Sequence, residues 1–154
     1  MSQKPLRVLV DADACPVKDE ALEVADRFGA ELVLVSNGGI RPSRYPGARI
    51  VVVGAGADAA DDWIAEEAGA RDTVVTADIP LAARALERGA TVLNPNGRPF
   101  TTESIGAALS MRAFNQHLRE TGESRGLNAA FTGADRARFR NQLDLALRRL
   151  AQMT

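Results

Sequence analysis

The chain has 154 residues, of which 45% are hydrophobic and 25% charged, the size and composition of one ordinary globular domain. A net charge of -1 excludes a basic field over the whole surface, and a single cysteine and a single histidine exclude a disulfide framework and a cysteine- or histidine-rich zinc site. The apolar runs are shorter than the ~20 residues of a membrane helix. The N-terminus has no secretory pattern. We therefore expect a cytoplasmic protein without a membrane segment.

Charge is divided unevenly along the chain. Residues 1–97 contain ten Lys and Arg against fifteen Asp and Glu, whereas residues 98–154 contain nine Arg against five acids. This division is compatible with cation binding by the acidic part and phosphate binding by the basic C-terminal third. Amphipathic helices with solvated arginines explain the same division, and charge alone favours that simpler interpretation.

Short apolar strands alternate with helical stretches. In chain order we expect strand 6–10, helix 16–28, strand 32–35, loop 36–48, strand 50–53, helix 57–67, strand 73–76, helix 79–88, strand 91–93 and a turn at 94–100. Strands that are apolar throughout are typical of a parallel sheet buried on both faces. The pattern predicts an α/β fold with a mostly parallel sheet of about five strands.

The chain beyond residue 98 has a helical pattern, interrupted by an expected loop at 121–132. Thr132 and Asp135 fit a capping box at the start of the last helix. An apolar stripe on this helix must pack against another element; it consists of Phe139, Leu143, Leu147 and Leu150. We expect a single domain over residues 1–154, with an α/β core at 1–97 and a helical part at 98–154.

Aspartates follow three of the predicted strands. Asp11 and Asp13 follow the first strand, Asp78 follows the fourth, and the third is followed by Asp58, Asp61 and Asp62. Parallel sheets bind ligands outside the carboxyl ends of their strands. Carboxylates gathered there raise each other's pKa values and destabilise the fold unless a cation neutralises them. A site made only of oxygen ligands selects Mg²⁺ or Mn²⁺.

Each acid also has a simpler explanation. Asp58 and Asp61 suit the first turn of a helix, and Asp78 can cap the helix that follows it. Asp11 and Asp13 directly follow a buried strand, where an acid is harder to explain structurally. The acids together favour a metal site. Other acids on helix faces or in turns, Glu20 and Asp72 among them, are interpreted as solvated.

The segments VDADACPVKDE, GADAADDWIAEEA, VVTADIPLAARALERGA and NPNGRPFT resemble the YaiI/YqxD family of bacterial proteins over nearly the whole chain. That family is grouped with the PIN-like nuclease superfamily. The resemblance implies a Rossmann-like, three-layer α/β/α sandwich and a metal-dependent nuclease site. The implied metal ligands are Asp11, with Asp13 beside it, Asp78, and one of Asp58, Asp61 and Asp62. Asn94 and Asn96 stand where PIN-like nucleases often carry another acid, which leaves the number of metal ions open.

These observations predict a Mg²⁺- or Mn²⁺-dependent nuclease that hydrolyses phosphodiester bonds, with RNA favoured as its nucleic-acid partner. The catalytic candidates are Asp11, Asp13 and Asp78. The cationic candidates for substrate phosphates are Lys18, Arg41, Arg44, Arg98 and Arg112. The polar candidates for lining the cleft are Ser36, Asn37, Thr76 and Asn94. The oligomeric state is left open, with a homodimer as one option.

Three other functions compete with this one. Asp11-Ala-Asp13 resembles the aspartyl nucleophile motif of phosphomonoesterases, although the order of the remaining motifs does not fit. The segment 54–59 fits a dinucleotide-binding G-x-G-x-x-A pattern, but acids at the start of the next helix would oppose a pyrophosphate. A non-catalytic module that binds nucleic acid or protein is the third alternative. Cys15 fits a packing residue better than a thiol of lowered pKa.

Overall fold

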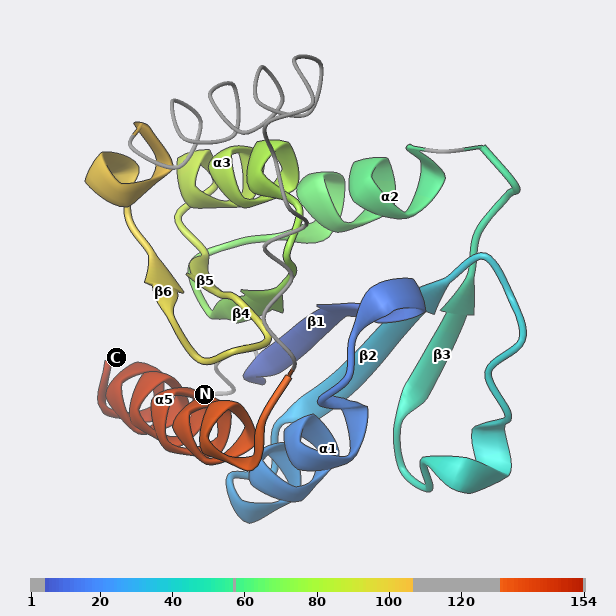
Figure 1. Cartoon of the computed structure of the whole chain (residues 1–154), viewed down its shortest axis with the longest axis horizontal. Helices are drawn as coiled ribbons and strands as arrows, with labels where there is room; N and C mark the ends of the chain where they lie inside the picture. The colour runs from blue at the N-terminus through green and yellow to red at the C-terminus, as the bar shows by residue number, and fades with distance from the viewer. Residues whose placement is uncertain (1–4, 57, 107–130, 154) are drawn as a thin grey trace.

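The computed structural model describes residues 5–56, 58–106 and 131–153 (Figure 1). The strands are β1 (Arg7–Asp11), β2 (Glu31–Ser36), β3 (Arg49–Val52), β4 (Asp72–Val75), β5 (Thr91–Leu93) and β6 (Pro99–Phe100). The helices are α1 (Lys18–Arg27), α2 (Ala59–Glu67), α3 (Ile79–Glu87) and α5 (Gly133–Gln152), with 3₁₀ turns η1 (Ala12–Ala14) and η2 (Pro42–Arg44).

The strands form one sheet in the order β3-β2-β1-β4-β5-β6. The first five strands in this order are parallel, and β6 runs antiparallel to β5. Helices α1 and α5 cover one face and α2 and α3 cover the other (Figure 1). The protein is therefore a three-layer α/β/α sandwich, which confirms the predicted fold class.

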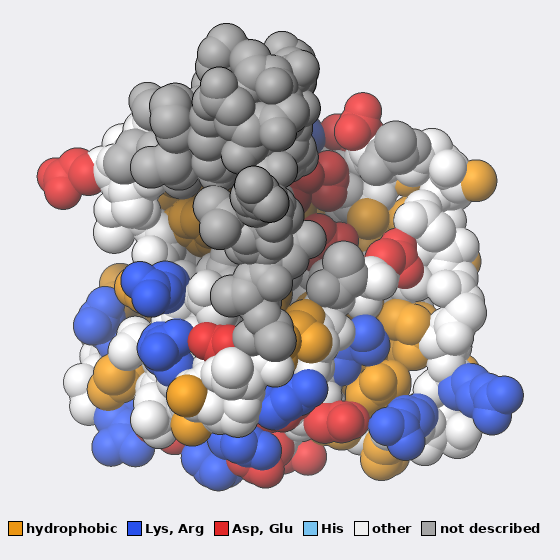
Figure 2. Space-filling model, in the orientation of Figure 1, with side chains coloured by type: hydrophobic (Ala, Val, Ile, Leu, Met, Phe, Trp, Pro, Cys, Tyr) orange, Lys and Arg blue, Asp and Glu red, His pale blue; other side chains and the backbone are white. Residues whose placement is uncertain are grey.

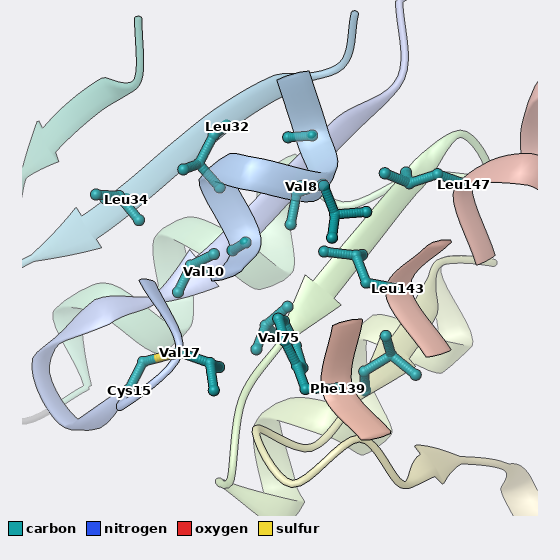
Figure 3. Packing of buried hydrophobic residues seen from close by; sticks show 14 of the residues in the cluster. Val8, Val10, Cys15, Val17, Leu32, Leu34, Val75, Phe139, Leu143 and Leu147 are labelled. Carbon is teal, nitrogen blue, oxygen red and sulfur yellow. The ribbon is translucent and has the colours of Figure 1, made fainter. Parts of the chain in front are cut away.

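Side chains that alternate along the strands build a separate core on each face. On one face Val8, Val10 and Val75 belong to the same cluster as the apolar stripe of α5, where Phe139 and Leu143 are fully buried (Figure 3). On the other face the alternate strand residues pack against α2 and α3. The period of two along each strand thus places every apolar residue of β1 in one of two cores.

Two local features differ from the sequence prediction. Residues 94–100 were predicted as a turn, but Pro99 and Phe100 form β6, with Phe100 opposite Val92. A strand of two residues is too short to show a hydrophobic period, and proline is tolerated because β6 lies at the sheet edge. The loop 36–48 also contains one regular turn, η2, which begins with proline.

Residue 97 joins β5 to β6 at a point of close contact with α5. Gly97 has a φ of +89°, and a Cβ atom built there would lie 2.6 Å from the backbone of Arg138 and Phe139. Thr132 begins α5 with the predicted capping box, in which Asp135 Oδ2 accepts from the Thr132 N–H at 2.9 Å. The last helix is therefore fixed both by its own cap and by the backbone of the preceding turn.

Within the described ranges, no helix is both long enough and apolar enough to span a bilayer.

Candidate functional site

The strand order changes direction between β1 and β4. The chain proceeds from β1 outward through β2 to β3 and then returns to β4 on the other side of β1. After β1 the chain enters α1 on one face, and after β4 it enters α3 on the opposite face. A crevice opens where two such connections diverge, and in doubly wound sheets this crevice is the usual ligand site. Asp11 ends β1 and Asp78 follows β4, so both acids stand at this point.

A buried threonine connects the two acids. The Thr76 hydroxyl donates to Asp11 Oδ2 at 3.0 Å and accepts from the backbone N–H of Asp78 at 3.0 Å. Asp78 caps α3 as expected, because its Oδ1 accepts from the Leu81 N–H at 2.8 Å. One oxygen of each carboxylate is thereby fixed, and the other accepts no hydrogen bond from the described residues. Thr76 positions the acids rather than presenting its hydroxyl to a substrate.

Helix α2 brings further acids to the same crevice. Partial burial, followed by the negative charges of Asp78, Asp11 and Asp58, raises the pKa of Asp61 to about 6. Burial also raises the pKa of Asp11 above its ordinary value, with smaller contributions from Asp78 and Asp13. Acids that the chain delivers from three strand ends are therefore close enough to repel one another.

The structure separates the three helix acids. The charges of Asp78, Asp11 and Asp58 add to the burial that raises the pKa of Asp61, whereas Asp62 forms an ion pair with Arg84 of α3 at 2.9 Å. Asp58 is the exposed N-cap residue of α2, and its side chain makes no capping hydrogen bond. Among these three residues, Asp61 is the one whose raised pKa reflects the charges of Asp11 and Asp78.

Asp13 is engaged by the loop that follows β2. Its Oδ1 lies 2.6 Å from the Ser36 hydroxyl and its Oδ2 accepts from the Asn37 N–H at 3.0 Å. The Asn37 side chain in turn donates to the Gly54 carbonyl at 2.6 Å. Asp13, Ser36 and Asn37 therefore connect the loops that follow β1, β2 and β3 at the site.

The carboxylates at the crevice suit an open metal site better than an enclosing one. Among the described residues, no three His, Cys, Asp or Glu side chains stand close enough together to enclose an ion. Mg²⁺ does not require such a cage, because it commonly keeps several waters and binds one or two carboxylates plus a substrate phosphate. The free oxygens of Asp11 and Asp78, with Asp61 beside them, fit this water-rich type of site.

A cleft of about 360 Å³ adjoins the acids on the side of the β2–β3 loop. It is lined by Asp13, three cationic side chains (Lys18, Arg41 and Arg44), and Tyr45, which is buried beside them. Basic side chains lie mostly on the lower half of the molecule, over α1, α5 and η2, while several acidic ones lie at the upper right, beside α2 (Figure 2). An acidic crevice and a cationic cleft thus stand next to each other.

Comparison with known proteins identifies the relatives of this chain. Residues 9–149 match the family model described as "Uncharacterized BCR, YaiI/YqxD family". The chain belongs to the YaiI/YqxD family. A UPF0178 protein of Mesorhizobium japonicum is 63% identical over 142 residues, which cover 92% of both chains. A UPF0178 protein of Agrobacterium fabrum is 55% identical over 150 residues and 97% of both chains. No solved structure matches the chain.

Other sequence candidates of this YaiI/YqxD protein lie in the turn between β5 and β6. Asn94 and Asn96 accept hydrogen bonds from the backbone N–H groups of Asn96 and Arg98 at 3.0 Å, as turn residues do. Asn94 and Arg98 line a separate cavity of about 410 Å³ with Phe100. Arg112, His117 and most of the expected loop at 121–132 lie outside the described residues.

Sequence reasoning missed Tyr45 and the partner of Asp62. Tyr45 stands in the loop sequence PSRYPG, where an aromatic residue between prolines was the available signal. Arg84 gave no signal, because its pairing with Asp62 depends on how α2 and α3 lie together. Cys15 is buried, and this burial raises the pKa of its thiol to about 11, which agrees with a packing role.

The opposite, amino-terminal edge of the sheet has a structural role in this family member. Arg7 donates to both oxygens of Asp72, at 3.0 and 2.8 Å, and also pairs with Glu67 at 3.1 Å. A cavity of about 600 Å³ lies beside this network. The ion pairs fully engage Asp72, so this cavity offers no unpartnered acid for chemistry.

Replacing Asp61 by asparagine is expected to stabilise the metal-free protein above pH 6. The folded-state pKa of about 6 exceeds the ordinary value of 3.8, so wild-type stability falls as pH rises between these values. Because Asp61 is only partly buried, solvent screening limits the gain to about 1 kcal/mol. Urea denaturation in EDTA at pH 3.5 and pH 7.5 tests this: the two proteins should differ at pH 7.5 only. A difference of equal size at both pH values would contradict the raised pKa of Asp61.

Proposed function

We propose that this protein is a divalent-metal-dependent nuclease that hydrolyses phosphodiester bonds, with single-stranded RNA as the favoured substrate. The observation that carries the proposal is the gathering of Asp11, Asp61 and Asp78 at the point where the strand order reverses, with pKa values raised for Asp11 and Asp61. Asp78 also caps α3, but charge repulsion between neighbouring carboxylates opposes folding. Acids in this position are explained by a cation that binds between them. The resemblance to PIN-like nucleases supports the same chemistry.

The residues divide the work of such a site. Asp11 and Asp78 would hold Mg²⁺ or Mn²⁺ through their free oxygens, with Asp61 completing the shell directly or through water. The ion, when bound, lowers the pKa of a coordinated water and polarises the phosphate. Thr76 holds the Asp11 carboxylate and the backbone of Asp78 in place through two hydrogen bonds. Hydrolysis joins the water oxygen to phosphorus and breaks one P–O ester bond, and the departing oxygen takes a proton.

The test is cleavage of end-labelled single-stranded RNA and DNA in Mn²⁺ by the wild type and Asp78→Asn, with EDTA as a control. Asparagine keeps an oxygen for the cap of α3, so the variant should fold, but it presents a neutral amide to the metal. We expect cleavage to fall at least 100-fold. Asp26→Asn, which changes an exposed acid of α1, is the matched control and should cleave normally. Activity that survives in EDTA, or in Asp78→Asn, would contradict the proposal.

The same assay separates the competing functions. Absence of cleavage with every substrate, together with RNA binding that is equally tight in EDTA and Mn²⁺, would support a non-catalytic binding module. A phosphate covalently trapped on Asp11 would instead indicate a phosphomonoesterase. Dinucleotide binding is disfavoured because Asp58 and Asp61 occupy the N-terminal turn of α2, where a pyrophosphate would have to bind.

A further inference from the structure

The cleft beside the acids is lined by more cationic than acidic side chains. Lys18, Arg41 and Arg44 line it together with one acid, Asp13. The guanidinium of Arg41 has no hydrogen-bond or ion-pair partner in the part of the chain that is described. Arg44 approaches Asp19 at 3.9 Å, and both side chains are 67% exposed, so this contact contributes little. Two of the three cations are therefore available to a ligand.

Lys18 is held in place by the chain itself. Its ammonium donates to the backbone carbonyls of Ala12 at 3.0 Å and Cys15 at 2.8 Å. An ammonium has three N–H donors, so one remains for a ligand. Because the two carbonyls fix the direction of the side chain, Lys18 adds a positioned positive charge to the cleft at a small additional entropic cost.

Asp13 connects the cleft to the acidic crevice. It lines the cleft, and its negative charge contributes to the raised pKa of Asp11. Both of its oxygens already accept hydrogen bonds from Ser36 and Asn37, which fixes the start of the loop that carries Arg41 and Arg44. A ligand in the cleft is therefore adjacent to the acids, and Asp13 acts as a positioning residue for the cationic loop.

The charge balance points to a particular phosphate. Three cations and one acid leave the cleft with two excess positive charges. An internal phosphodiester carries one negative charge, whereas a terminal phosphate monoester carries about 1.5 to 2 at pH 7. The volume of the cleft is at the small end of the range of about 300–1,000 Å³ for ligand pockets, which suits the end of a chain better than a long segment.

We propose that the cleft formed by Lys18, Arg41 and Arg44 binds the terminal phosphate of a nucleic-acid strand. The end of that strand is thereby placed beside the acids. This inference rests on the proposed nuclease function for its biological meaning. Its physical content, selective binding of a terminal phosphate, does not require cleavage and can be measured separately.

The experiment measures binding of internally labelled RNA octamers by fluorescence anisotropy, in EDTA and at constant 0.1 M salt. The octamers carry a 5′-phosphate, a 3′-phosphate or hydroxyls at both ends, which identifies the end that is bound. We expect one phosphorylated octamer to bind at least tenfold more tightly than the hydroxyl form. The double substitution Arg41→Gln and Arg44→Gln should reduce that preference to less than threefold. Arg149→Gln, at an exposed position of α5, removes the same type of charge and should leave the preference unchanged.

Either of two results would overturn the inference. Equal binding of all three octamers to the wild type would show that no terminal phosphate is selected. A preference that persists in the double variant would place the phosphate elsewhere. Cleavage without end preference would refute this inference alone, and end preference without cleavage would refute the proposed hydrolysis alone.

Discussion

Asp11→Asn is expected to reduce Mn²⁺-dependent cleavage by about 1,000-fold without weakening the fold. Asp11 ends β1 beside β4, where a carboxylate can share a cation with Asp78. Loss of a charged ligand removes several kcal/mol of transition-state stabilisation, and each 1.36 kcal/mol corresponds to a factor of about ten in rate. Asparagine still offers an oxygen to the Thr76 hydroxyl, so the local hydrogen bond is kept.

Stability gives the second measurement for the same variant. Burial raises the pKa of Asp11, so its ionised form opposes folding at neutral pH, and a neutral amide relieves that opposition. Differential scanning calorimetry should show an unchanged or raised Tm for Asp11→Asn in EDTA. The rise in Tm that Mn²⁺ causes in the wild type should be absent in the variant. A lowered Tm in EDTA would show that the Asp11 carboxylate stabilises the fold. A full response to Mn²⁺ would show that Asp11 is not a metal ligand.

Gly97→Ala is expected to lower the free energy of unfolding by about 3 kcal/mol, because two costs combine at this position. Alanine is strained at a φ of +89°, and its Cβ would lie 2.6 Å from the backbone of Arg138 and Phe139. Strain and overpacking each cost about 1–3 kcal/mol. The clash is with the backbone of a long helix, which cannot move aside as the end of a side chain can. Urea denaturation measures the loss.

Gly89→Ala separates the two costs. Gly89 has nearly the same φ, +86°, but a Cβ there would lie 3.9 Å from Ala70, an ordinary contact. This control should therefore show only the conformational strain, about 1 kcal/mol. Equal losses in the two variants would mean that α5 shifts to accommodate the methyl group and that the close approach at Gly97 is not a constraint.

Local signals in the sequence were sufficient for most of the fold. The apolar runs identified all five parallel strands to within a residue or two, and Thr132 with Asp135 correctly predicted the start of α5. Propensity, capping and strand period depend on residues close together in the chain, so one sequence determines them. The acids at the ends of β1 and β4 were found in the same way, because parallel strands place their carboxyl ends at one edge.

The environment of individual acids was decided by tertiary structure. Glu20 and Asp72 were interpreted as solvated, yet both are buried. Arg136 reaches Glu20 from 116 residues away at 2.9 Å, and Arg7 reaches Asp72 across two neighbouring strands. The residues next to an acid in the sequence do not indicate which side chain of a distant helix will cover it. Burial of these acids follows only from the docking of α5 on α1 and of β4 on β1.

The candidate site likewise contains some residues that the sequence identified and others that only the tertiary structure brought there. The sequence by itself placed Asp11 and Asp78 at one sheet edge, because strand direction follows from the alternation of strands and helices. Only the tertiary structure gave Asp61 and Asp62 different surroundings, since Arg84 of α3 forms an ion pair with Asp62 while partial burial raises the pKa of Asp61. It also brought Arg41 from the loop after β2 to a cleft beside the loop after β1. Such contacts depend on the relative placement of separate elements, which local patterns do not encode.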